Sequence, residues 1–240
     1  MIPGALRDAV DLILSGDPYT LSVIWFSFKV AFASLAIAVV IGLPLGILLG
    51  TTRFAGRLGF LTLVNAAMGL PPVVAGLVTF MVLRNNGVFG DAQLLFTPAA
   101  MVIAQVPLAA PLIAGITMAS ISALPASIKI QARSLGASRL QEAKLLAGQA
   151  RASLFAAVIA GFGATISEVG AILITGGNLL VGGKNYTRTM TTAIVLETRL
   201  GNFSRAMAFA VILLVAILFV NILFTRAQTG GRGGSSGRSV

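Results

Sequence analysis

The amino-acid sequence predicts an all-α polytopic membrane protein with five transmembrane helices. Hydrophobic residues make up 57% of the 240 positions and charged residues only 10%, and the mean hydropathy is +0.96, far from the averages of soluble domains. A helix needs about 20 apolar residues to cross the ~30 Å hydrocarbon core of a bilayer. Five segments are long and apolar enough: residues 21–50, 58–83, 94–120, 152–175 and 206–225.

The distribution of basic residues predicts how these spans are oriented. Segments on the cytoplasmic side of a membrane carry an excess of Lys and Arg. The segments that follow the first, third and fifth spans hold ten bases: Arg53, Arg57, Lys129, Arg133, Arg139, Lys144, Arg151, Arg226, Arg232 and Arg238. The opposite side holds six: Arg7, Arg84, Lys184, Arg188, Arg199 and Arg205. We therefore expect an outside N-terminus and a cytoplasmic C-terminus.

Prolines and glycines interrupt the first three spans. The first contains Pro44 among several glycines, the second contains Pro71 and Pro72 at its middle, and the third contains three prolines. Each proline removes a backbone donor, so the freed carbonyls need another partner or a water-filled cavity. Two interpretations are open: ordinary kinks in a packed bundle, or second and third spans that line a gated path.

Small residues and one acid mark the fourth span. Gly163, Ser167, Ala171 and Thr175 recur every fourth residue, a stripe that favours close helix packing in lipid. Glu168 is the one acid inside the five predicted spans, and Lys29 is the one base, at a similar depth. The two are expected either to form an ion pair or to be satisfied separately, with Lys29 reaching outward and Glu168 hydrogen-bonded locally.

The polar segment between the third and fourth spans is too regular to be a simple connector. Residues 127–135 fit a short helix, and Gly136 stands where a helix ends in a left-handed residue. Ser138 with Gln141 three residues later is a capping-box pattern, which predicts a second helix over 139–146. We expect a helix–turn–helix that projects into the cytoplasm as a compact unit.

Composition excludes several kinds of chemistry. There is no cysteine and no histidine, which removes disulfides, thiolate chemistry and imidazole proton relays. No metal site and no catalytic residues are predicted, and no loop has the Gly-rich, Lys-containing pattern that holds nucleotide phosphates. The net charge of +10 is interpreted as a topology signal, with no nucleic-acid partner. An intramembrane enzyme would need more than one acid, and a secondary carrier would show an inverted repeat that is not evident.

The polar segment and the fourth span together resemble one family. Residues 132–138 (Ala-Arg-Ser-Leu-Gly-Ala-Ser) are similar to the coupling loop of ABC importer permeases. Residues 160–171, 176–178, 186–193 and 196–198 resemble the tungstate-type members, relatives of the molybdate and sulfate permeases. The resemblance covers nearly all of residues 20–226. One departure is Ile130-Gln131-Ala132 where the family loop commonly begins Glu-Ala-Ala.

The resemblance implies a binding-protein-dependent importer of a small tetrahedral oxyanion, most simply tungstate, with molybdate or sulfate as alternatives. A secondary anion carrier or channel is the alternative of a different class. ATP with Mg²⁺ would be bound and hydrolysed by a separate cytoplasmic ATPase, so this chain would bind no cofactor and would not be an enzyme. The other implied partners are an extracytoplasmic oxyanion-binding protein, membrane lipid and a second copy of the chain, since five spans are few to enclose a path.

The resemblance also implies which residues act. The ATPase-coupling loop is expected to use Ala132, Arg133, Leu135, Gly136, Ala137, Ser138, Arg139 and Glu142. The translocation path or gate is expected to involve Lys29, Ser167, Glu168, Gly176, Gly177 and Asn178. Residues 1–226 would form the permease domain, and residues 227–240, rich in Gly and Ser, a disordered cytoplasmic tail.

Overall fold

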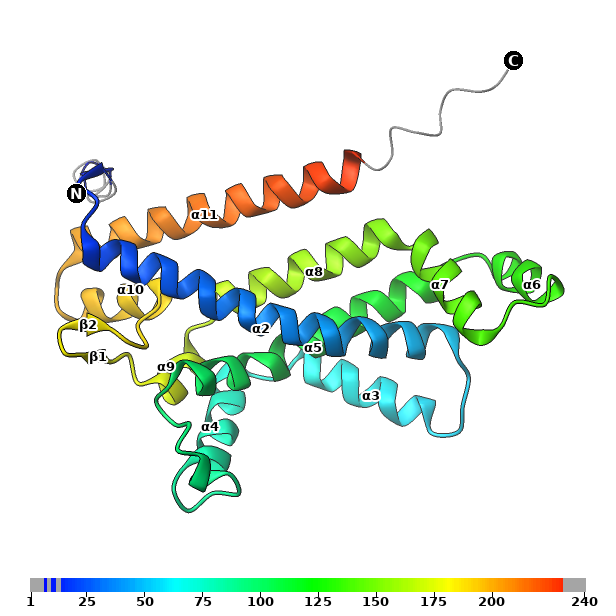
Figure 1. The fold of residues 1–240 in the computed structure, drawn as a ribbon, viewed down its shortest axis with the longest axis horizontal. Coiled ribbons are helices and arrows are strands. Elements are labelled where there is room, and N and C mark those ends of the chain that lie inside the picture. The colour runs from blue at the N-terminus through cyan, green and yellow to red at the C-terminus, as the bar shows by residue number, and fades with distance from the viewer. Residues whose placement is uncertain (1–6, 8–9, 12–13, 231–240) are drawn as a thin grey trace.

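The computed structural model describes residues 7, 10–11 and 14–230, and almost all of its regular structure is helical. Figure 1 shows the long helices running along one axis of the molecule, with shorter helices at both ends. The elements are α2 (Pro18–Thr51), α3 (Arg57–Met68), α4 (Pro72–Leu83), the 3-10 turn η1 (Gly90–Ala92), α5 (Pro98–Ser122), α6 (Ala126–Ser134), α7 (Arg139–Gln149), α8 (Arg151–Ile166), α9 (Gly170–Gly176), β1 (Leu180–Val181), β2 (Lys184–Asn185), α10 (Met190–Arg199) and α11 (Phe203–Gly230).

Three helices are long and apolar enough to cross a membrane, namely α2, α5 and α11. Two further pairs, α3 with α4 and α7 with α8, pass the same test only when each bent pair counts as one span. The described chain thus has three to five candidate spans.

The expected second and fourth spans are not single helices. α3 and α4 meet at an angle of 104°, because Pro71 and Pro72 follow the end of α3 and start a new helix. α8 ends at Ile166, and three residues separate it from α9. In contrast, α2 is a continuous helix across Pro44, and α5 is a continuous helix across Pro107 and Pro111.

Glycines allow α2 and α5 to approach at backbone distance. A Cβ added to Gly46 would lie 2.5 Å from the Ala114 carbonyl oxygen, and one added to Gly42 would lie 2.7 Å from that of Ala110. Gly50 continues the same face one turn later, against Ile121. This spacing of four residues is the small-residue stripe that joins helices in lipid, where there is no hydrophobic drive between them.

The small-residue stripe expected on the fourth span is different in the structure. The break after Ile166 places Gly163 and Ala171 on separate helices, and a Cβ on Gly163 would meet nothing within 4 Å. Ala171 does make a close contact, because a Cβ on Gly76 of α4 would lie 2.6 Å from its Cα.

The largest buried cluster joins all four long helices. Leu35 of α2, Ile113 of α5, Phe162 of α8 and Val220 of α11 are among its members. A polar bridge crosses the same interior: the Ser34 hydroxyl donates to Gln105 Oε1 at 2.6 Å, and Gln105 Nε2 donates to the Thr165 carbonyl at 2.8 Å. These bonds tie α2, α5 and α8 together in a region where an unsatisfied polar group would be costly.

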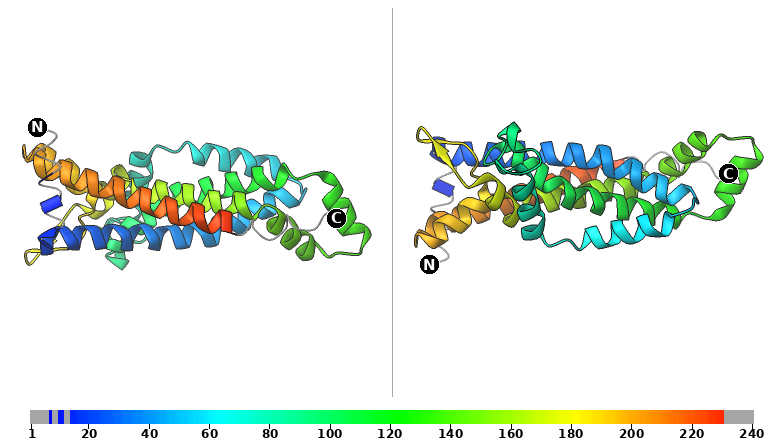
Figure 2. Two further views of the ribbon diagram at one scale, coloured as in Figure 1. Left: turned by 90° about the horizontal axis from the view of Figure 1, so that it is seen from above. Right: turned by 90° about the horizontal axis from the view of Figure 1, so that it is seen from below.

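The two ends of the bundle differ in construction, as both views of Figure 2 show. One end carries α6 and α7. The other carries α10 and the short β1–β2 hairpin, whose turn residues Gly182 and Gly183 have φ of 58° and 75°, the conformation that a tight hairpin requires. α11 continues to Gly230, beyond the expected domain boundary at 226, and the remainder of the predicted tail lies outside the described residues.

Candidate functional site

The predicted helix–turn–helix is present, and its turn has a defined geometry. Gly136 has a φ of +76°. The Ala137 N–H donates to the Ala132 carbonyl and the Gly136 N–H to the Arg133 carbonyl, both at 3.0 Å. This pair of bonds is the Schellman motif, in which a left-handed residue ends a helix and satisfies its last carbonyls.

The second helix begins with the predicted capping box. The Ser138 hydroxyl accepts a hydrogen bond from the Gln141 N–H, and Gln141 Oε1 accepts one from the Ser138 N–H at 2.8 Å. Both ends of the turn are thus closed by local hydrogen bonds, so its shape is set by residues 132–141 themselves.

An ion pair and an apolar anchor fix the helix pair. Arg133 donates to both carboxylate oxygens of Glu142, at 2.9 and 3.2 Å, and the hydrogen bonds and charge of Glu142 raise the pKa of Arg133. Glu142 is 4% exposed. Leu146 of α7 is fully buried against Ile121 at the end of α5. The pair α6–α7 is therefore tied to the bundle through α7.

The tip of this helix pair presents exposed apolar side chains. Leu135 is 88% exposed, Leu140 67% and Ile130 63%. Isolated exposed leucines are ordinary, but three on one short projecting unit are typical of a contact surface. Ile130 and Leu140 were not among the predicted coupling residues. Ala132, which was, is buried and supports the turn from inside.

The predicted path residues lie in three separate places. Lys29 is exposed on α2, and Ser167 is exposed at the end of α8, where its hydroxyl donates to the Gly163 carbonyl. Glu168 is buried in the break, and its Oε1 accepts a hydrogen bond from the Ala171 N–H at 2.8 Å. Ion pairs join Arg133 to Glu142 and Arg205 to Glu197, and neither involves Lys29 or Glu168. The structure therefore supports local satisfaction of Glu168 and not a Lys29–Glu168 pair.

The third place is the turn after α9, where the polar groups are already engaged. The Thr187 hydroxyl donates to the Gly176 carbonyl at 2.5 Å. Arg188 donates to Asn178 Oδ1 at 3.1 Å and to the Tyr19 hydroxyl at 2.7 Å. Asn178 itself has a φ of 54°, a left-handed conformation that Asn tolerates. These bonds hold the hairpin segment against the start of α2.

The helices that follow the two breaks, α4 and α9, are in contact. A Cβ on Gly170, in the first turn of α9, would lie 2.9 Å from the Val73 side chain of α4. The Thr191 hydroxyl of α10 donates to the Glu168 carbonyl at 2.8 Å, which satisfies one acceptor freed by the break. The helices α4 and α9, which follow the breaks at 69–71 and 167–169, thus pack together at their first turns.

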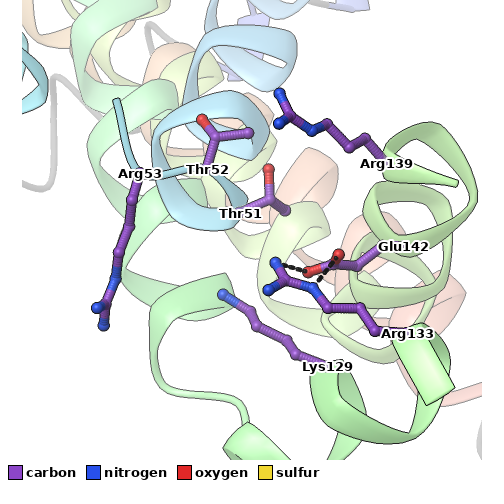
Figure 3. A pocket seen from close by; sticks show the side chains of 7 residues that line it. All are labelled: Thr51, Thr52, Arg53, Lys129, Arg133, Arg139 and Glu142. Carbon is purple, nitrogen blue, oxygen red and sulfur yellow. Dashed lines mark hydrogen bonds and ion pairs between the residues drawn. The ribbon is translucent and has the colours of Figure 1, made fainter. Parts of the chain in front are cut away.

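The cavities described below lie in different parts of the molecule, and none includes a predicted path residue. One, of about 640 Å³, is lined by Arg84, Asn85, Asn86, Gln93, Leu95 and Phe96. A second, of about 410 Å³, opens between the end of α2 and the α6–α7 pair. Figure 3 shows its lining residues: Thr51, Thr52, Arg53, Lys129, Arg133, Arg139 and Glu142. A small cavity of about 200 Å³, lined by Arg57 and Ser122 among others, adjoins the second.

Sequence reasoning missed the residues whose role depends on distant partners. Gln105 lies in an apolar helix, and a lone Gln inside a predicted span was the available signal, since a buried amide needs partners. Lys129 was counted for topology, yet its ammonium caps α2 by donating to the Gly50 carbonyl at 3.0 Å. Arg57 donates likewise to the Leu49 carbonyl at 2.9 Å. No local pattern indicates these capping pairs.

Comparison with known proteins agrees with this architecture. Residues 42–229 match the family described as "Binding-protein-dependent transport system inner membrane component". A probable anion ABC transporter permease of Haloferax volcanii is 36% identical, covering 90% of this chain and 94% of the relative. The tungstate uptake system permease TupB of Peptoclostridium acidaminophilum is 35% identical, covering 95% and 98%.

The fold is also found among solved structures. An inward-facing structure of the MetNI methionine ABC transporter aligns with a TM-score of 0.72 at 19% identity, covering 89% of this chain and 96% of that one. At that identity the likeness concerns the fold. The length of the family match, with relatives similar over almost their whole length, shows that this chain is a multi-pass membrane protein of the binding-protein-dependent transport family, an ABC importer permease.

Proposed function

We propose that this permease belongs to an ATP-driven importer of a small tetrahedral oxyanion, and that the oxyanion is tungstate. The observation that carries the proposal is the near full-length similarity to an anion permease and a tungstate permease, at 36% and 35% identity. Molybdate and sulfate are the alternatives, because both share the tetrahedral shape and double negative charge of tungstate. Selection among them belongs mainly to an external binding protein.

The energy would enter through α6 and α7. In this proposal a separate cytoplasmic ATPase binds ATP with Mg²⁺ and docks on the exposed side chains Ile130, Leu135 and Leu140. The closed turn at Gly136 and the Arg133–Glu142 pair support this role, because the α6–α7 pair can transmit motion only if its own shape is fixed. Leu146 then connects the α6–α7 pair to α5.

The membrane arrangement follows from the same proposal. The chain would cross the membrane five times if α3–α4 and the α8 segment each count as one span, with the α6–α7 end in the cytoplasm. The oxyanion-binding protein would dock on the opposite end, and two copies of the chain would form a homodimer around the path. The proposed path or gate includes Lys29, Ser167, Glu168, Gly176, Gly177 and Asn178. The two helix breaks support a gate there, because interrupted helices that pack on one another offer backbone that can rearrange.

The decisive experiment is reconstitution with an ABC ATPase and the oxyanion-binding protein in proteoliposomes. We expect ATP-dependent uptake of tungstate that an excess of unlabelled tungstate abolishes and that sulfate competes with weakly. Uptake of molybdate or sulfate in preference would move the assignment to the alternative substrate. Uptake without ATPase would contradict an ABC mechanism.

A substitution at the turn tests the coupling role in the same system. Gly136→Val forces a β-branched residue into a left-handed conformation, which costs roughly 1–2 kcal/mol or more, although its Cβ would meet no neighbour within 4 Å. We expect normal membrane insertion with loss of ATPase stimulation and uptake. Gly148→Ala, also without Cβ neighbours but inside α7, is the matched control and should retain both. Full transport by Gly136→Val would remove the coupling assignment.

A further inference from the structure

The cavity beside α6 and α7 is strongly basic. Its lining contains four cationic side chains and one carboxylate, a net charge of +3: Arg53, Lys129, Arg133 and Arg139 against Glu142. Three different segments supply these groups, namely the end of α2, α6 and the start of α7. Arg133 is neutralised by its pair with Glu142, so the positive charge left over comes from Arg53, Lys129 and Arg139.

The intramolecular contacts do not use all of this positive charge. Glu142 is fully engaged, because both its oxygens accept from Arg133. Lys129 gives one of its three protons to the Gly50 carbonyl. Arg53 and Arg139 have no acceptor within the part of the chain that the structure describes, and both are exposed to the cavity or its margin. The guanidinium groups of Arg53 and Arg139, and two of the three protons of the Lys129 ammonium, are therefore left without an acceptor in the described chain.

The remaining lining groups select the kind of ligand. The Thr51 and Thr52 hydroxyls donate to the Ile47 and Leu48 carbonyls at 2.8 and 2.6 Å, so hydrogen bonds to a ligand must come from the cations. Arg and Lys bind phosphate-like oxyanions well, since several N–H donors converge on several oxygens. A volume of about 410 Å³ holds such an anion with several waters, each of which occupies about 30 Å³ in the liquid.

We propose that this cavity is a binding site for one tetrahedral oxyanion or phosphate group, held by Arg139 and Lys129. Arg53 also lines the cavity, but its guanidinium group points away from Arg139 (Figure 3). A bound anion would contact the end of α2 and the start of α7 at once. It would therefore strengthen the attachment of the helix pair to the bundle, which Leu146 and the Lys129 bond to Gly50 already make. The inference does not depend on the transported substrate, because binding is a property of the permease alone. The phosphate group has two sources, free anion in solution or the headgroup of an acidic phospholipid.

Equilibrium binding to the purified full-length permease tests the site directly. Radiolabelled inorganic phosphate, and tungstate in parallel, are titrated against the protein in nanodiscs of phosphatidylcholine at low ionic strength. We expect saturable binding at one site per chain. Arg139→Gln should weaken it about tenfold or more, the size expected for loss of one charge-assisted hydrogen bond.

A matched variant separates a site from general charge. Lys144→Gln removes one positive charge from the same helix, α7, but Lys144 does not line the cavity, so its affinity for phosphate should stay within about twofold of the wild type. Both changes replace side chains on the exposed surface of α7, and a thermal melt confirms that each variant is folded. Equal weakening by the two variants would overturn the proposal.

The lipid composition of the nanodisc distinguishes the two sources. If phosphatidylglycerol raises the apparent dissociation constant for phosphate in the wild type and not in Arg139→Gln, the occupant is the lipid headgroup. If phosphatidylglycerol has no effect, the occupant is the free anion. A wild type that neither binds phosphate or tungstate nor retains an acidic lipid in native mass spectrometry would refute the site, and the cations would then serve carboxylates of the ATPase.

Discussion

At the scale of single residues, Asp17 shows how one side chain begins the longest helix. Its carboxylate accepts hydrogen bonds from the Thr20 hydroxyl at 2.6 Å and the Thr20 N–H at 2.8 Å. These bonds lower the pKa of Asp17 below its ordinary value of 3.8, because they favour the charged form. Pro18 follows at the first helical position, where its missing N–H costs nothing.

This lowered pKa predicts a pH dependence of stability. The folded state holds the Asp17 proton less tightly than the unfolded state, so its contribution is complete above the ordinary pKa and is lost as the pH falls through the folded pKa. Asp17→Asn keeps the acceptor and does not titrate. We expect its thermal unfolding midpoint to fall less than that of the wild type between pH 6 and pH 3, while Asp17→Ala loses about 1 kcal/mol at pH 7. Parallel pH curves for wild type and Asp17→Asn would contradict the assignment.

Two buried polar residues of α5 should respond in opposite ways. Gln105 is 2% exposed and bonds to both Ser34 and Thr165. Gln105→Leu removes the side-chain donor to the buried Thr165 carbonyl, whereas the Ser34 hydroxyl keeps its bond to the Val30 carbonyl, so the change should cost about 1–3 kcal/mol. The Thr117 hydroxyl is buried and has no hydrogen-bond partner in the described chain, so Thr117→Val should be neutral or stabilising. Melting of both variants in detergent measures the difference, and equal destabilisation would show that Thr117 has a partner.

At the scale of elements, the contact of α2 with α5 depends on missing side chains. Gly46→Ala places a Cβ 2.5 Å from the Ala114 carbonyl oxygen and 2.6 Å from Thr117 Cβ, atoms of the helix framework that cannot rotate away. We expect a loss of about 1–3 kcal/mol or more and reduced yield of folded protein. Gly59→Ala in α3, where no neighbour lies within 4 Å, should gain about 0.5–1 kcal/mol. Size-exclusion profiles and melts of the two variants test this, and a stable Gly46→Ala would mean that α2 and α5 can separate freely.

The elements that sequence reasoning located correctly are those with local signals. The α6–turn–α7 unit is set by Gly136, Ser138 and Gln141, each acting within a few residues, and α11 is a plain apolar run. The break between α8 and α9 was missed, because no proline or glycine stands at residues 167–169. Its stability comes from Ala171 and Thr191, which satisfy Glu168 from other elements.

The glycines of α2 were noted in the sequence, but they were interpreted as interruptions of the span. Whether glycines bend a helix or admit a neighbour depends on what lies opposite, and that is a property of the tertiary structure. The role of the six predicted path residues stays a prediction, because it too depends on what lies opposite each of them. Lys29 and Glu168 share a depth along their helices, yet the side chain of Lys29 is exposed and Glu168 bonds to the backbone of α9.

At the scale of the whole molecule, the two ends are built differently. The α6–α7 end combines a fixed turn, exposed apolar side chains and the basic cavity. The opposite end is closed by the Arg188 contacts to Asn178 and Tyr19, which hold the hairpin against α2. A transporter needs such a division, because one side must receive mechanical input while the other receives the substrate.

The assignment of these ends to the two sides of the membrane is itself testable. Arg53, Lys129 and Arg139 lie at the α6–α7 end, and the positive-inside tendency favours this end in the cytoplasm. A reporter fused after Thr225, in the last turns of α11, should be active only in the cytoplasm, and one inserted at Asn86, beyond α4, only outside. The two fusions control for one another, because they lie at opposite ends of the bundle. Activity of the Thr225 fusion on the outside would invert the molecule and place α6 and α7 beyond the reach of any cytoplasmic ATPase.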